Sequence, residues 1–171
     1  PIEQVALAEA CGRVLAAPVD APRNLPPFAN SAMDGFALRW REGLVEDTML
    51  PVLAEQAAGD GIAGQSEGAC SIMTGARIPD GLDTVVPVDD CTVLARDGEG
   101  RPTSIALSHA PQPGQHVRHA GEDVAVGQLV LETGVRLDEE ALLVLRGSTS
   151  GAAASARGAS CTASSVDICH G

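Results

Sequence analysis

Short runs rich in Val, Ile, Leu and Thr recur along the middle of the chain, and clusters of Gly, Pro and Asp separate them. Runs of this length, bounded by Asp-Gly and Pro-Gly pairs, are typical of strands joined by turns. The pattern predicts strands over 49–54, 69–75, 83–88, 91–95, 103–108, 115–120 and 128–132. Their spacing of about 10 to 15 residues favours a twisted or barrel-like β domain over βαβ units.

Helical patterns are few. Val5 and Leu7 alternate ahead of the segment EACGRVLA, which predicts a short strand leading into a short helix. The segment LDEEALLVLRG predicts a second helix, because acidic side chains occupy its first turn, Arg146 lies in its last turn and Gly147 is a stop signal. The fold class is therefore mainly β with a few short helices.

Two segments depart from this pattern. Prolines at positions 18, 22, 26 and 27 make one stretch extended, since each fixes φ and removes a backbone donor, and this stretch reads as a hinge or a domain crossing. The segment 148–171 is dominated by Ala, Gly and Ser. Burial of this small amount of apolar surface cannot offset the conformational entropy lost when the segment is ordered. We therefore expect the tail to be disordered.

Charge narrows the classes of function. The chain has 171 residues, a formal net charge of −12 and no lysine, and the acidic excess is concentrated in its middle third. Such a chain would repel a polyphosphate backbone, which argues against nucleic-acid binding. No apolar stretch approaches the roughly 20 residues of a membrane span, and no signal segment opens the chain, so we expect a soluble, cytoplasmic protein.

The hexapeptide Asn30-Ser31-Ala32-Met33-Asp34-Gly35 is the most unusual in the chain. An Asp-Gly turn presents a carboxylate at the surface, where it can accept hydrogen bonds from a substrate or take one coordination position of Mg²⁺. The structural alternative is that Asn30 or Ser31 caps a helix beginning near Ala32. The two interpretations are compatible.

A second candidate corner follows a β-like run, at Thr74-Gly75. A Thr-Gly corner can offer a hydroxyl and consecutive amide donors to an anion, the arrangement called a nest. Such corners are also common as ordinary turns, so this signal is weak by itself.

Three blocks of sequence together resemble one family: P-x-F-x-N-S-A-M-D-G-F-A, then I-M-T-G-A-x-x-P-x-G-x-D-x-V-V, then G-Q-x-V-R-x-x-G-E-D. Over residues 1–147 the chain resembles the molybdopterin molybdenumtransferases, relatives of the C-terminal domain of gephyrin. The resemblance implies irregular, bifurcated and coiled β-sheets. It also implies an elongated, dimer-forming first domain (1–21 and 128–147) and an inserted β-rich second domain (22–127). On this resemblance we expect the family's pterin-binding third domain and its fourth domain to be absent, and the 148–171 tail to be a disordered or frame-shifted segment.

The resemblance also implies an activity. Family members insert molybdate into adenylylated molybdopterin with release of AMP, assisted by Mg²⁺, in a cleft between the third domain of one subunit and the second domain of its partner. It marks Asp34 and Thr74 as catalytic residues, Asp34 as a possible magnesium ligand, and Asn30, Ser31, Gly75 and Asp123 as further candidates for the substrate cleft. The partners implied are a second copy of the chain, the pterin substrate and the molybdopterin adenylyltransferase of the same pathway.

Two alternatives stay open beside this interpretation. Half of an interdomain cleft is expected to be inactive alone, so the chain can also be read as a non-catalytic dimerisation or interaction scaffold that retains the family fold. A weaker alternative is an acidic β domain that binds a divalent cation through its Asp-Gly turns.

Overall fold

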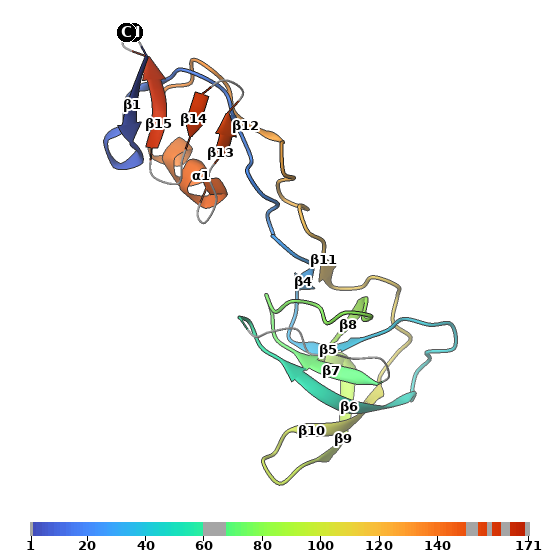
Figure 1. Cartoon of the computed structure of the whole chain (residues 1–171). Helices are drawn as coiled ribbons and strands as arrows, with labels where there is room; N and C mark the ends of the chain where they lie inside the picture. The colour runs from blue at the N-terminus through green and yellow to red at the C-terminus, as the bar shows by residue number, and fades with distance from the viewer. Residues whose placement is uncertain (1, 60–67, 150–153, 157–158, 162–164, 170–171) are drawn as a thin grey trace. The chain divides into compact units, whose positions relative to one another are not determined.

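A computed structural model describes residues 2–59, 68–149, 154–156, 159–161 and 165–169 (Figure 1). The chain divides into two compact units. The split unit consists of Pro1–Pro27 and Ala120–Gly171, and the inserted unit of Phe28–His119. The domain boundaries expected from the family resemblance stay a prediction. Within the described residues, no helix has the length and apolar character needed to cross a membrane.

The split unit is built from short strands and one helix. Its main sheet has the order β1-β15-β2, and smaller pairs join β12 to β3 and β13 to β14. The elements are β1 (Ile2–Ala6), the 3₁₀ helix η1 (Leu7–Glu9), β2 (Val14–Leu15), β3 (Val19–Asp20), β12 (Leu129–Leu131), α1 (Glu139–Thr149), β13 (Ala154–Ala156), β14 (Ala159–Cys161) and β15 (Ser165–Cys169). The helix expected over EACGRVLA is wrong, because Gly12, at φ +77°, turns the chain and β2 follows.

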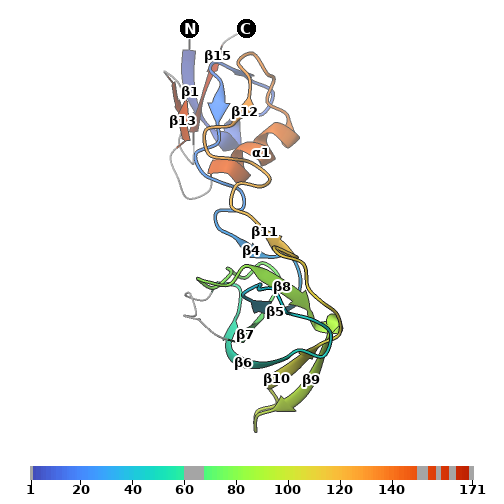
Figure 2. The same ribbon diagram turned by 90° about the vertical axis from the view of Figure 1, so that its right-hand side faces the viewer.

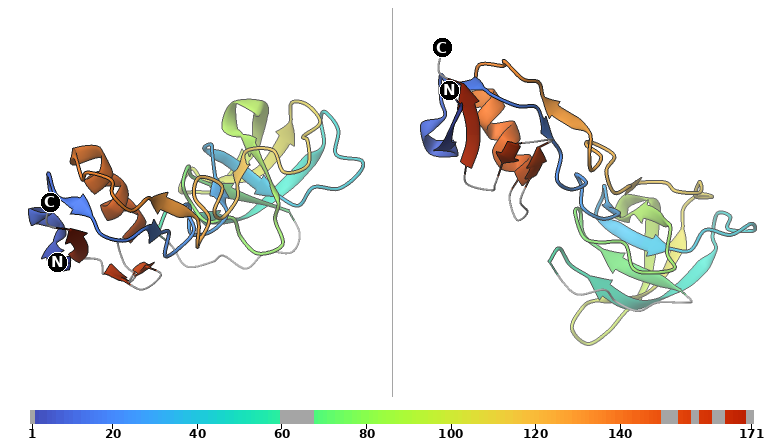
Figure 3. Two further views of the ribbon diagram at one scale, coloured as in Figure 1. Left: turned by 90° about the horizontal axis from the view of Figure 1, so that it is seen from above. Right: turned by 45° about the horizontal axis from the view of Figure 1, so that its top comes forward.

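Helix α1 confirms the second predicted helix. Asp138 caps it, since its Oδ1 accepts a hydrogen bond from the Ala141 N–H at 2.8 Å. Ala141, Leu142 and Leu145 pack into the same apolar core as the β1-β15-β2 sheet, and α1 lies beside that sheet in both views of Figure 3. The helix continues to Thr149, so Gly147 is not its stop.

Part of the tail is ordered, which differs from the expectation of disorder. Strand β15 pairs antiparallel with β1, Val166 opposite Val5, and with β2, Ile168 opposite Leu15. The reason is local: Val166 and Ile168 alternate, so one face of the strand carries two aliphatic side chains, and both are buried. The rest of the expectation falls on 150–153, 157–158, 162–164 and 170–171, which lie outside the described residues.

The inserted unit contains a six-stranded mixed sheet with the order β8-β5-β7-β6-β10-β9 (Figure 2). All pairs are antiparallel except β6 with β7. Its elements are β4 (Asn30–Ser31), β5 (Gly35–Leu38), β6 (Met49–Gln56), β7 (Ala69–Ile72), β8 (Thr84–Pro87), the 3₁₀ helix η2 (Val88–Asp90), β9 (Cys91–Arg96), β10 (Pro102–Leu107) and β11 (Val117–Arg118). With one α-helix among the described residues, the mainly β class is confirmed.

Strand β5 lies between β8 and β7, one strand in from the edge of the sheet, and is buried on both faces. Phe36 and Leu38 belong to one apolar cluster, whereas Ala37 belongs to a second cluster on the opposite face. Gly35, at the start of β5, lies opposite Ile72, near the end of β7. The residue before Gly35 and the residues after Ile72 therefore meet at one end of the sheet, and these are the two loops singled out by the sequence.

Candidate functional site

Asp34 and Thr74 are joined directly. The Asp34 Oδ1 atom accepts two hydrogen bonds from Thr74, one from the backbone N–H at 2.6 Å and one from the hydroxyl at 2.7 Å. The Asp34 carbonyl oxygen accepts a third bond, from the Val88 N–H at 3.1 Å, which holds its backbone against the end of β8. Both side chains are exposed. The two sequence blocks that carried the strongest signal thus form one surface site, in which Asp34 Oδ1 accepts both bonds from Thr74 and Oδ2 accepts neither.

Ser31 and Asn30 are buried in β4, the strand that precedes the Asp34 turn. Ser31 is 1% exposed, and its hydroxyl forms a tight turn with Met33, donating to the Met33 carbonyl oxygen at 2.6 Å. Residues 32–34 form bends between β4 and β5 rather than a helix, so the expected helix cap at Asn30 or Ser31 is wrong. A serine side chain that closes its own turn removes the need for a helix here.

The Thr74-Gly75 corner is a turn whose amide groups are already used. The Thr74 N–H is bonded to Asp34, the Gly75 N–H donates to the Ser31 carbonyl oxygen at 2.8 Å, and the Ala76 N–H donates to the Met73 carbonyl oxygen at 3.0 Å. Gly75 has φ +79°, which a glycine adopts without strain. The corner therefore holds a carboxylate of the protein itself, and it has no consecutive free amides for an external anion.

Asp123 belongs to the split unit, where its N–H donates to the Leu25 carbonyl oxygen at 2.9 Å. Asp34, Thr74, Asn30, Ser31 and Gly75 all belong to the inserted unit. The structure therefore brings five of the six candidates together, and Asp123 stays a prediction.

The hydrogen bonds from Thr74 stabilise the charged form of Asp34. They hold the pKa of this carboxyl below its ordinary value of 3.8, the backbone N–H contributing more than the hydroxyl. Asp34 is therefore ionised throughout the neutral range, which is the form that binds a metal ion and accepts hydrogen bonds most strongly. The pKa of Asp34 is lower in the folded chain than in the unfolded chain. The hydrogen bonds therefore stabilise the fold at pH values above the unfolded pKa, and this stabilisation is lost as the pH falls through the folded pKa.

Thr74→Val tests that assignment of cause. We expect the pKa of Asp34 to rise toward 3.8 but to stay below it, because valine removes the hydroxyl and keeps the backbone N–H. NMR titration of the Asp34 carboxyl carbon measures this value, and Thr74→Ser, which keeps the hydroxyl, is the matched control. Equal pKa values in the valine and serine variants would show that the hydroxyl has no effect.

Comparison with known proteins decides the family. The family model described as the MoeA N-terminal region (domain I and II) matches residues 1–148. The chain belongs to the molybdopterin molybdenumtransferase (MoeA) family. The resemblance seen in the three sequence blocks is thereby confirmed.

Curated relatives and solved structures agree with this placement. The molybdopterin molybdenumtransferase of Haemophilus influenzae is 39% identical over 145 residues, which cover 84% of this chain and 34% of that protein. Molybdopterin molybdenumtransferase 2 of Mycobacterium tuberculosis is 41% identical over 141 residues, covering 76% and 32%. A crystal structure of the molybdopterin biosynthesis MoeA protein from Pyrococcus horikoshii superposes with a TM-score of 0.81 at 25% identity, covering 98% of this chain and 39% of that one. The chain spans about a third of the length of these MoeA relatives.

This MoeA site offers Mg²⁺ a single protein ligand, the Asp34 carboxylate. Among the described residues no three His, Cys, Asp or Glu side chains are grouped closely enough to hold a metal ion. Mg²⁺ in proteins is commonly held by one or two carboxylates together with water and substrate phosphates. The ionised, exposed Asp34 carboxylate suits one such position through Oδ2, and the remaining ligands would have to come from elsewhere.

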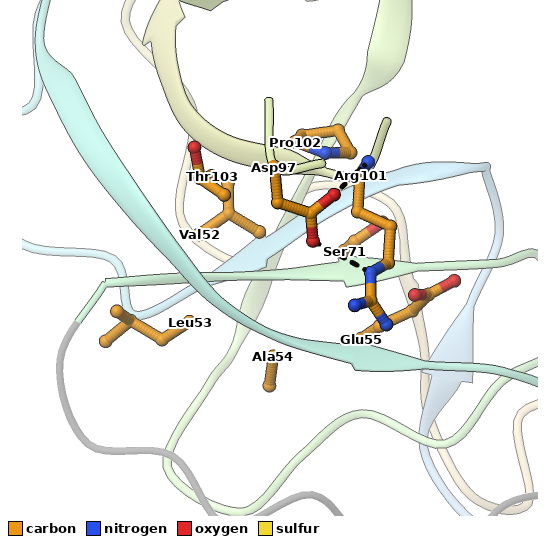
Figure 4. A pocket seen from close by; sticks show the side chains of 9 residues that line it. All are labelled: Val52, Leu53, Ala54, Glu55, Ser71, Asp97, Arg101, Pro102 and Thr103. Atoms are coloured by element: carbon orange, nitrogen blue, oxygen red, sulfur yellow. Dashed lines mark hydrogen bonds and ion pairs between the residues drawn. The ribbon is translucent and has the colours of Figure 1, made fainter. Parts of the chain in front are cut away.

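A separate pocket of about 250 Å³ lies in the same unit, between β6 and the turn that joins β9 to β10 (Figure 4). Its one cation, Arg101, contacts Asp97 at 3.0 Å and Glu99 at 2.7 Å. The pocket contains none of the candidate residues and its arginine is neutralised locally, so we assign it no role in the chemistry of this MoeA chain.

Arg77 is a further residue beside the site, and no sequence pattern singled it out. Arg77 follows the MTGA block, and its guanidinium lies over the Phe28 ring, 5.7 Å from the ring centroid. The sequence did contain one indication of its importance. The chain is acidic and has only 11 Lys and Arg residues, and Arg77 lies directly beside a site motif.

Proposed function

We propose that this chain supplies the second-domain side of the active cleft of a molybdopterin molybdenumtransferase, which inserts molybdate into adenylylated molybdopterin with release of AMP. Family membership and the relatives' names support the reaction. The observation that carries the site is the pair of hydrogen bonds from Thr74 to one oxygen of Asp34, which joins the two family motifs at an exposed position. A cytoplasmic homodimer, and exchange of the pterin with an adenylyltransferase, belong to the same proposal.

Asp34 and Thr74 have different roles in this proposal. The hydroxyl of Thr74 has one proton, which is directed to Asp34, so Thr74 is a positioning residue rather than a donor to the substrate. Its two hydrogen bonds hold Oδ1 and leave Oδ2 available for a ligand. Asp34 Oδ2 then accepts a hydrogen bond from the pterin or from water, or takes one position of Mg²⁺. When bound, the ion would neutralise charge on the substrate phosphates.

A chimera provides the test. Residues 1–147 of this chain would replace the matching N-terminal third of the Haemophilus influenzae relative, and molybdenum cofactor synthesis would be measured from purified components. We expect Asp34→Asn to lower the rate by about a hundredfold or more, since misplacing one group of a cleft has effects of this order. We expect Thr74→Val to lower it less and Thr74→Ser to retain most of it.

Asp97→Asn is the matched control. Asp97 is also a carboxylate whose pKa is lowered by hydrogen bonds, led by the Arg101 N–H, and it lies in the turn between β9 and β10. Its replacement should leave the rate unchanged. An active chimera that is insensitive to Asp34→Asn would contradict the proposed site and favour the scaffold alternative.

A further inference from the structure

Asn30 lies between two arginines. In β4 it is paired with Arg118 of β11 on one side, and an isolated antiparallel bridge pairs it with Arg77 on the other. Residues directly opposite each other in antiparallel pairs point to the same face, with Cβ atoms about 5 Å apart. Arg77, Asn30 and Arg118 therefore form a row across three adjacent segments, which we call the Asn30 row.

The Asn30 row lies on the face of these segments that is turned from the apolar core, where Arg77 is exposed, Arg118 is half-buried and Asn30 is 8% exposed. Chain neighbours of the row residues belong to one apolar core cluster or pack against it: Ala29, Ala76, Ile78 and Val117. Because neighbours along an extended chain point to opposite faces, the row points away from that core. The site residues are close in the chain, since Arg77 follows Thr74 by three positions and Asn30 precedes Asp34 by four.

Arg77 is the exposed guanidinium of the row. Its planar group is placed by the Phe28 ring, and among the described residues it has no hydrogen-bond or ion-pair partner. Two other arginines of the unit have partners elsewhere: Arg101 contacts Asp97 and Glu99, and Arg96 donates to the Gly100 carbonyl oxygen at 2.7 Å. Arg39 and Arg41 are exposed like Arg77 but lie outside the row. Arg118 is half-buried and has an interaction of its own. A stacked arginine keeps its N–H groups available at the edge of the plane.

We propose that the Asn30 row binds a tetrahedral oxyanion, either a phosphate group of the pterin substrate or molybdate. The exposed guanidinium of Arg77, next to a side-chain amide, supplies donors of the kind that recognise such anions, and Arg118 adds positive charge to the row. The row also reduces electrostatic repulsion at the site. Without its positive charge, the acidic excess of the unit and the ionised Asp34 would repel an anionic substrate. This inference rests on the proposed function, because it names the groups that hold the anion beside Asp34.

Anion binding by the full chain, residues 1–171, tests the inference without requiring catalysis. Sodium molybdate or inorganic phosphate would be titrated at constant ionic strength. Binding would be followed by the NMR shift of the Asn30 side-chain amide and by the thermal midpoint from Trp40 fluorescence. We expect saturable binding, and at least about a tenfold increase in Kd for Arg77→Gln, the loss expected for a charge-assisted contact. Phe28→Leu should weaken binding by a few-fold, because the arginine loses its stacking partner.

Arg101→Gln is the matched control, since it removes an arginine of the same unit that already has acidic partners. Its Kd should equal that of the unaltered chain. A preference for phosphate assigns the row to the substrate phosphate, and a preference for molybdate assigns it to the metal oxyanion. Absence of saturable binding, or equal weakening by Arg77→Gln and Arg101→Gln, overturns the inference. The chimera experiment on Asp34 is independent of this result, so failure of the row and failure of the proposed function are distinguishable.

Discussion

Gly35→Ala is expected to lower the free energy of unfolding of the inserted unit by about 3 kcal/mol or more, at the upper end of what overpacking costs. A Cβ atom at this position would lie 2.1 Å from the Val86 carbonyl oxygen and 2.9 Å from the Pro87 Cα atom. Both are backbone atoms of β8, so no side-chain rotation relieves the overlap. Strand β8 would have to move away from β5.

That movement also reaches the site. The Val88 N–H, one residue beyond β8, donates to the Asp34 carbonyl oxygen at 3.1 Å. Displacing β8 therefore shifts the backbone of Asp34, and we expect an activity loss in the chimera along with the loss of stability. The Gly of the NSAMDG block is explained by this close approach of two strands.

Urea unfolding followed by Trp40 fluorescence measures the effect. Trp40 is the chain's single tryptophan and lies in the inserted unit, so its signal reports on that unit. Gly98→Ala is the matched control, because a Cβ at Gly98 meets nothing within 4 Å, and its effect should stay within about 0.5 kcal/mol. Equal unfolding midpoints for Gly35→Ala and the unaltered chain would contradict the close approach of β5 and β8.

Strand positions were predictable because they depend on local patterns. The runs at 49–54, 91–95 and 103–108 correspond to β6, β9 and β10 within two residues at each end. Their pairing was not predictable in the same way. The parallel alignment of β6 with β7 and the position of β5 between β8 and β7 depend on contacts between segments distant in sequence.

At the site, the sequence indicated which residues matter but not what each one does. NSAMDG and MTGA were recognisable as blocks, yet only the structure shows that the second block holds the carboxylate of the first. The nest expected at Thr74-Gly75 is occupied by the protein's own acceptors for that reason. The pairing of Asn30 with two arginines was likewise hidden, because Arg77 and Arg118 are 41 positions apart in the chain.

Ile168→Ala is expected to lower the free energy of unfolding of the split unit by about 2–5 kcal/mol, the range for removing a buried isoleucine side chain. Ile168 is 0% exposed and lies opposite Leu15 of β2, in the same core as Val5, Leu137 and Leu145. The alanine would leave a cavity between strands β1, β15 and β2 and helix α1. Amide hydrogen exchange of β1, whose residues pair with β15, measures the loss within this unit.

Leu143→Ala is the matched control for this change. Leu143 is on α1 in the same unit but is 66% exposed, so its truncation should cost less than about 0.5 kcal/mol. Protection of the β1 amides that is equal in the two variants would show that β15 contributes nothing to the fold. A large difference would mean that Val166 and Ile168, two alternating aliphatic residues, are enough to anchor an Ala-, Gly- and Ser-rich segment to a preformed core. Composition averaged over the segment hides this effect, because burial of one strand face depends on where its few apolar residues lie.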